Sequence, residues 1–172
     1  MVPVELRQLM RHMEWADSLA WNAVLTHPAS EGDAPTRERL MHVHGVQWAY
    51  LQIWRGEPLD LPDPSSFHDL PAVRAWGRGY HAAAVGFMES LDPATLGNEI
   101  HFPWAAQLVQ RFGALHPSTL SQTILQITSH STYHRGQVNA RLREIGGEPP
   151  LTDFIVWVWR GEPAPEWPSE GG

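Results

Sequence analysis

Two histidines with helical spacing are the residues of this sequence best suited to chemistry. His130 and His134 lie four positions apart in the proline-free segment 125–137. Four residues of α-helix advance about 6 Å and return close to the same side of the helix, so both imidazoles project from one face. Such a pair can chelate one first-row metal ion. The alternative is a pair with no ligand role, either on the helix surface or divided between core and surface.

The surrounding periodicity predicts that this pair faces the protein interior. Residues recur at steps of three and four, as in the core-facing stripe of an amphipathic helix: Leu120, Ile124, Ile127, Ser131, His134, Val138, Leu142 and Ile145. His134 therefore replaces an apolar residue of the stripe, with His130 at its edge. A buried imidazole needs a partner for each ring nitrogen. A metal would satisfy one nitrogen of each ring and a hydrogen-bond acceptor the other.

Composition narrows the functional classes. The chain has 172 residues, which suits one domain with a sizeable core. Its net charge of −7, from 12 basic and 19 acidic residues without a basic cluster, argues against nucleic acid or an anionic membrane as partner. It has no cysteine, which excludes disulfides, thiolate zinc sites and cysteine nucleophiles and fits the cytoplasm, where we expect the protein. We expect no signal peptide and no membrane span.

Four long helices must position the histidines. Apolar periodicity, prolines and capping residues predict helices over residues 3–26, 36–55 and 70–91. A fourth is predicted after Pro117, capped by Ser118 or Thr119 with Gln122 completing a capping box, and ending at Gly146-Gly147.

The fold class that follows is all-α: a four-helix bundle with a short extra segment between helices three and four. That segment, residues 94–116, is ambiguous: 100–104 suits an extended stretch and 105–112 a short helix. One domain is expected over residues 1–160, including a short apolar piece at 154–159. Residues 161–172, rich in proline and glycine, are expected to form a flexible C-terminal tail.

A third metal ligand must come from another helix. The predicted second helix offers His42 and His44, which lie two positions apart and therefore about 200° apart around the helix axis. Only one of them can face a given partner. Each shares a face with apolar residues, so periodicity does not choose between them.

Three parts of the chain form a recognisable set. They are Trp15-Ala-Asp17; His42–Leu51 with Trp54-Arg-Gly-Glu57; and His130–Val138 with Leu142–Asp153. Together they resemble the DinB/YfiT-like family, whose name does not imply a relation to the DNA polymerase that shares it. The most specific part is the run His-x-x-x-His-Arg-Gly-Gln, and the likeness is loose between residues 59 and 116.

The resemblance implies a metal held by three histidines on a four-helix bundle. Aligning the Trp-Arg-Gly-Glu sequence places the ligand of the second helix at His42, beside His130 and His134 on the last. His44 falls where the family does not require a histidine. Gln47 stands where relatives often carry an acidic residue, which predicts weaker support of the ligands or an altered choice of metal.

Three neutral imidazoles suit Zn²⁺, Ni²⁺ or Fe²⁺ and leave positions open for water or substrate. Characterised members of the resembled family include transferases and isomerases that use low-molecular-weight thiols such as bacillithiol or mycothiol, while many have no known activity. We therefore expect a metal-dependent transferase or hydrolase acting on a small electrophile, in which the metal activates a thiol cosubstrate or a water.

Four further residues are candidates around such a site. Gln137 and Tyr133 are candidates for contacts with a ligand histidine or with substrate. Asp153 could orient a ligand histidine, although a loop aspartate more often caps backbone N–H groups. Arg135 is expected to be a structural ion-pair partner.

Two other functions can be compared with the sequence. A di-iron carboxylate bundle needs two Glu-x-x-His motifs, and Glu14 and Glu144 are followed three positions later by aspartate and glycine instead. The remaining alternative is a non-catalytic bundle with a structural metal, serving as a binding or interaction module.

The first two helices are apolar over more than one face, so we expect a homodimer.

Overall fold

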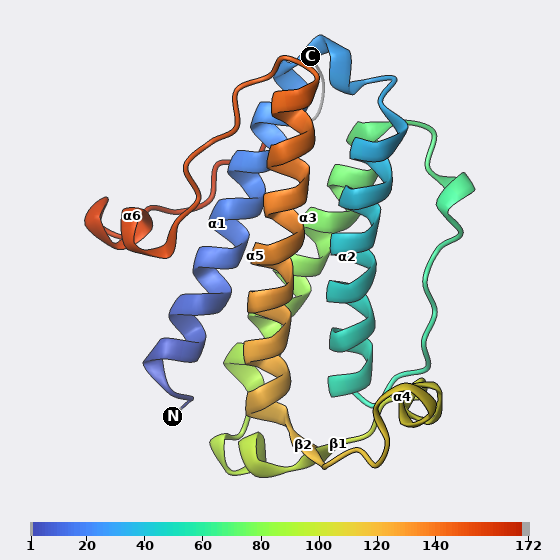
Figure 1. The fold of residues 1–172 in the computed structure, drawn as a ribbon. Coiled ribbons are helices and arrows are strands. Elements are labelled where there is room, and N and C mark those ends of the chain that lie inside the picture. The colour runs from blue at the N-terminus through green and yellow to red at the C-terminus, as the bar shows by residue number, and fades with distance from the viewer. Residues whose placement is uncertain (1, 170–172) are drawn as a thin grey trace.

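The computed structural model describes residues 2–169 and confirms the all-α four-helix bundle. Its long helices are α1 (Val4–Thr26), α2 (Ala34–Trp54), α3 (Leu70–Ser90) and α5 (Leu120–Glu144). Helix α5 packs against α1 on one side and α2 on the other, and α3 closes the bundle behind them (Figure 1). The site-bearing helices α2 and α5 are therefore direct neighbours.

Capping side chains set where the long helices begin. Asp33 accepts a hydrogen bond from the Thr36 amide at 2.9 Å, and α2 starts at Ala34, two residues before the predicted start. Pro35 is tolerated because the first helical turn needs no backbone N–H donor. The predicted capping box of α5 is confirmed, with Thr119 and Gln122 bonding each other's backbone N–H groups.

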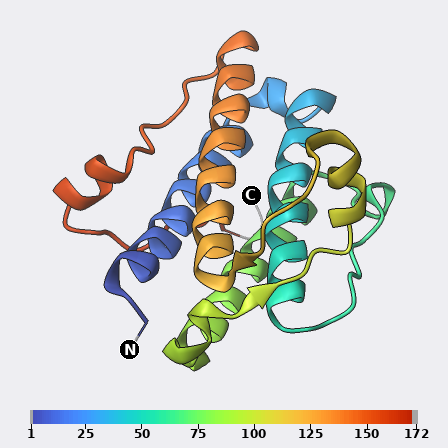
Figure 2. The same ribbon diagram turned by 60° about the horizontal axis from the view of Figure 1, so that its bottom comes forward.

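Short elements connect the long helices. Two single 3₁₀ turns, η1 (Pro28–Ser30) and η2 (Pro64–Ser66), lie before and after α2. Between α3 and α5 follow η3 (Pro93–Gly97), β1 (Glu99–Ile100), α4 (Ala105–Phe112) and β2 (Ser118–Thr119). The two strands pair antiparallel, and α4 projects beside the end of α2 (Figure 2). The predicted short helix over 105–112 is confirmed, whereas the extended stretch is shorter and ends at Ile100.

The C-terminal segment returns to the bundle. The apolar piece predicted at 154–159 forms the short helix α6 (Phe154–Trp159), which buries Trp157 against Trp15. Beyond it, Glu162 pairs with Arg11 at 2.7 Å, and the Trp167 indole N–H donates to Glu14. Contacts of Glu162 and Trp167 thus tie this segment to α1; residues 170–172 of the predicted tail lie outside the described residues. The flexibility of this tail, like the homodimer, stays a prediction.

Most of the core is apolar, and the tryptophans Trp15 and Trp21 are buried in it. Trp48 and Trp54 are partly buried and pack against its rim. None of the helices in the described part of the chain is long and apolar enough to cross a membrane.

A buried carboxylate joins all four long helices in the middle of this core. Asp17 of α1 pairs with Arg135 of α5 at 2.5 Å and accepts hydrogen bonds from Gln47 of α2 at 2.8 Å and His81 of α3 at 3.0 Å. Burial alone would raise the pKa of Asp17, but Arg135 and His81 outweigh it and hold that pKa well below its usual range. The predicted role of Arg135 as a structural ion-pair partner is confirmed.

His44 belongs to this polar network and not to the surface of α2. Its Nε2 accepts a hydrogen bond from the Trp21 indole at 2.8 Å, and its Nδ1 donates to the Gln47 side chain at 2.7 Å. An indole N–H can only donate, so Nε2 must be unprotonated and the ring neutral. Burial lowers the pKa of His44 to about 4, against the opposing effects of Asp17 and Gln47.

This lowered pKa predicts a loss of stability in mild acid. Between pH 6.5 and about 4 the unfolded chain protonates His44 while the folded chain does not, so the free energy of unfolding falls with pH by on the order of 3 kcal/mol. Urea unfolding of metal-free protein at several pH values should show a shallower decline for His44→Gln than for wild type. The exposed His68→Gln serves as control. An equal decline in all three proteins would contradict the assignment.

Gly77 of α3 makes room for the His44 ring. A Cβ at this position would overlap the ring well inside van der Waals contact, and hydrogen bonds at both nitrogens hold the ring in place. We predict that Gly77→Ala lowers the free energy of unfolding by about 1–3 kcal/mol through overpacking.

The matched control for this change is Gly86→Ala on the same helix, where a Cβ meets nothing within 4 Å. That substitution should raise the free energy of unfolding by roughly 0.5–1 kcal/mol, because alanine favours the helix. Chemical denaturation measures both, and equal effects of the two substitutions would contradict the packing described.

Candidate metal centre

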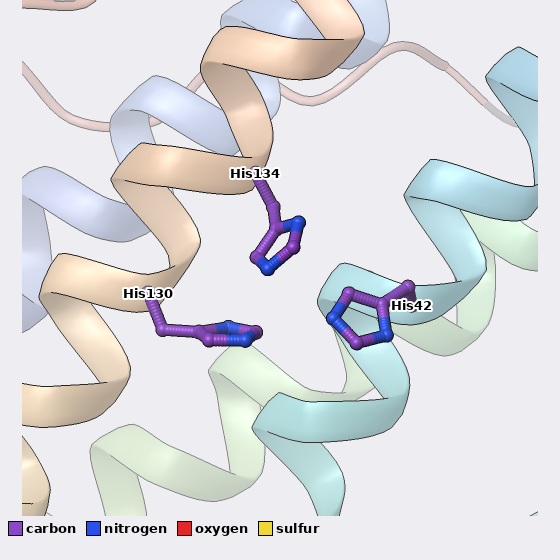
Figure 3. A group of neighbouring side chains, drawn as sticks. All are labelled: His42, His130 and His134. Carbon is purple, nitrogen blue, oxygen red and sulfur yellow. The ribbon is translucent and has the colours of Figure 1, made fainter.

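Three histidine rings converge between α2 and α5. His42 projects from α2, and His130 and His134 project from successive turns of α5 (Figure 3). Ring centroids are 4.2 Å apart for His130 and His134, 4.4 Å for His42 and His134, and 5.3 Å for His42 and His130. One nitrogen from each ring lies within 4.8 Å of the others. Small side-chain rotations would close this group, hereafter the histidine triad, around one ion with bonds of about 2.1 Å.

Burial and neighbouring rings favour the neutral form of two triad residues, His130 and His42. Burial lowers the pKa of His130 to about 4, with further lowering by the neighbouring His134 and His42. The pKa of His42 is also lowered, by partial burial and then by His134. A neutral imidazole offers a lone pair to a metal, whereas a protonated one does not.

The hydrogen bonds leave ring nitrogens available. His134 Nδ1 donates to the Gln137 side-chain oxygen at 2.9 Å, which leaves Nε2, on the other side of the ring, available as a ligand atom. His130 Nδ1 is buried and has no hydrogen-bond partner among the described residues. A buried nitrogen without a partner is costly unless something else satisfies the ring. The residues present therefore fit a divalent metal.

The position of the triad differs in one respect from the sequence prediction. His134 is half-buried at the edge of the bundle and does not belong to the core-facing stripe. Its neighbour Arg135 is buried instead, because its charge is paired with Asp17 in the polar network. The buried face of α5 is thus rotated slightly relative to the predicted one, and both ligand candidates of α5 lie where this helix borders α2.

The other candidates separate into neighbours of the triad and residues elsewhere. Gln137 contacts His134 as described, and Tyr133, 66% exposed, packs edge-on against the same ring at 4.9 Å. Gln47 is fully buried and bonds His44. The weaker ligand support or altered choice of metal expected from glutamine at this position stays a prediction. Asp153 makes no capping hydrogen bond and lines a separate surface hollow with His12.

A second group of metal-ligating side chains lies in the core: Asp17, His44 and His81 also have ligand atoms within 4.8 Å of one another. Hydrogen bonds account for this group without an ion. Both nitrogens of His44 are engaged, and the Asp17 carboxylate already has the donors Arg135, Gln47 and His81. A metal there would displace the Trp21 indole from its only acceptor in this network.

Sequence reasoning did not find the cleft beside the triad. This hollow of about 370 Å³ is lined by His42, Gly45, Val46, Ala49, Leu61 and Trp104. Leu61 and Trp104 come from the connections on either side of α3. These connections have no regular hydrophobic repeat from which the direction of a side chain could be predicted. Packing of Phe102 against Tyr50 of α2 and against Trp104, both at 5.2 Å, holds the second of these connections near α2.

The architecture defines a class: four-helix bundles with three histidines, one from the second long helix and two from the last, grouped at the helix border. Residues 2–164 match the family model of the DinB family, and the chain belongs to that family. No curated protein matches the chain.

The contact between Gln137 and His134 yields a prediction about metal affinity. Removing the acceptor by Gln137→Ala frees the ring of His134 to rotate and change tautomer, which should weaken divalent-metal binding about 10–100-fold. Gln126→Ala, at an exposed position of the same helix, is the control. Isothermal titration of zinc into chelator-treated protein measures both, and unchanged affinity in Gln137→Ala would show that the contact does not support a ligand.

Proposed function

We propose that this protein is a divalent-metal-dependent transferase or hydrolase acting on a small electrophile, with His42, His130 and His134 as the metal ligands. The observation that carries the proposal is the convergence of three imidazoles on one point between α2 and α5. The lowered pKa values of His42 and His130 favour their neutral form. Zn²⁺, Ni²⁺ and Fe²⁺ are the ions best suited to such a donor set.

A divalent cation with three protein ligands and open positions lowers the pKa of a bound water or thiol and so supplies a nucleophile at neutral pH. The chain's own residues prepare this site. Gln137 fixes the tautomer and direction of His134. Tyr133, exposed beside the same ring, is placed to contact an incoming substrate.

Any thiol in the reaction must be a cosubstrate, because the chain has no cysteine. A low-molecular-weight thiol would enter from the solvent side of the triad, where His42 is exposed. With such a thiol the reaction is a transfer to the electrophile, and with water it is a hydrolysis.

The surface position of the triad supports catalysis over a structural role for the metal. The Asp17 network already joins α1, α2, α3 and α5 within the core. A metal at the border of α2 and α5 would add only a link between two helices already held by that network. Stripping the metal from such a site should lower the melting temperature modestly and leave the fold intact.

The ligand assignment is tested by metal content after zinc loading. His42→Ala, His130→Ala and His134→Ala should each lose most of the metal, measured by elemental analysis, whereas His81→Gln and His68→Gln should retain it. Circular dichroism checks that every variant is folded. Retention by the three triad variants together with loss in His81→Gln would move the metal into the core and overturn the assignment.

The open positions are tested with cobalt. We expect millimolar thiol to change the absorption spectrum of Co²⁺-loaded wild-type protein, with an intense near-ultraviolet band, and to have no such effect on His134→Ala. A cobalt spectrum insensitive to thiols and azide would indicate a closed centre. The function would then be that of a binding or interaction module with a structural metal.

A further inference from the structure

We propose that the cleft beside the triad binds the apolar part of the substrate, so that the substrate is a small molecule carrying a short alkyl chain or a single aromatic ring next to its reactive polar group. The inference rests on the proposed function, which supplies the polar end of the site. At about 370 Å³ the cleft lies at the small end of the range for ligand pockets.

The chemistry of the lining selects an apolar group. Val46, Ala49, Leu61 and Trp104 surround the hollow, and none of the described side chains that line it is charged. His42 belongs both to this lining and to the triad. If the apolar part of a ligand filled the cleft, the atoms bonded to that part would therefore lie at the triad.

Gly45 supports the same conclusion independently. It lies inside α2, where glycine is disfavoured relative to alanine. Its own packing does not require glycine: a Cβ would meet only the Trp76 ring, at the ordinary contact distance of 3.8 Å. Gly45 lines the cleft one turn after His42, so at this point the wall of the cleft carries no side chain.

The probes are hydroxamic acids, which bind divalent zinc through one end and present an alkyl chain at the other. Acetohydroxamate, butanohydroxamate and hexanohydroxamate are titrated calorimetrically into zinc-loaded protein. Affinity should rise about fourfold for each methylene that enters the cleft. In NMR spectra, the resonance of the Trp104 indole N–H is assigned by its loss in Trp104→Phe. This resonance should shift when hexanohydroxamate is added and should not shift with acetohydroxamate.

Gly45→Leu adds a side chain to the cleft wall and should abolish the dependence of hydroxamate affinity on chain length. The zinc content of this variant is measured separately, so that a loss of the metal is distinguished from a filled cleft. The matched control is Gly79→Leu, since a Cβ at Gly79 meets the Trp48 ring at 3.7 Å, nearly the same environment away from the cleft. If Gly45→Leu does not fold, Trp104→Ala, which lies outside the long helices, should lower the gain per methylene.

Each outcome is decisive. Equal affinity of zinc-loaded wild type for the three hydroxamates would overturn the cleft proposal but not the metal centre. The same holds if the dependence of affinity on chain length persists in Gly45→Leu. Failure of the protein to bind zinc or acetohydroxamate overturns the proposed function itself. A further outcome concerns a second copy of the chain. If light scattering shows that wild type is a dimer and Gly45→Leu a monomer, and if chain length has no effect on hydroxamate affinity, then a second copy occupies the cleft and the proposal is wrong.

Discussion

The buried Asp17 carboxylate is the constraint on which the arrangement of the helices depends. An ionised carboxylate in a protein core is costly unless charged and hydrogen-bonding partners surround it. Here the partners come from α2, α3 and α5, so the charge is satisfied only when all four long helices are correctly placed. Removing one partner leaves a buried group unpaired, which costs far more than the pair itself contributes.

The same network aligns the triad. Gln47, which bonds Asp17, also donates to Ser131 at 3.1 Å, and Ser131 directly follows His130. Arg135, which pairs with Asp17, directly follows His134. The bonds that hold α2 against α5 are therefore adjacent in sequence to the ligand candidates of α5. Rigid packing in the core thus positions imidazoles that are themselves at the helix border, where His42 is exposed to solvent.

Much of this fold is predictable from sequence, because its signals are local. Prolines and capping residues mark the helix ends, as the Thr119–Gln122 capping box shows. Four-residue spacing brings His130 and His134 together without knowledge of the rest of the chain. The choice between His42 and His44 is not local: His44 is directed inward by Trp21, a partner 23 residues earlier in another helix. Periodicity could not decide it, and only the family resemblance favoured His42.

The cleft was beyond sequence reasoning for a similar reason. Leu61 and Trp104 lie in irregular connections whose path is set by packing on α2, and only the folded chain brings them beside His42. Gly45 carried a signal, since a glycine inside a predicted helix often has a packing or functional cause. Its cause could be identified only once the neighbours of α2 were known.

The most direct test of the account is X-ray absorption spectroscopy at the zinc edge of zinc-loaded protein. If the histidine triad holds the metal, the spectrum shows three nitrogen ligands at about 2.0–2.1 Å with the outer-shell scattering of imidazole rings, together with oxygen ligands from solvent. The imidazole contribution should be lost together with the metal in His42→Ala. A spectrum with fewer than three imidazoles and an added carboxylate, unchanged in His42→Ala, would place the metal at Asp17, His44 and His81 and contradict the account.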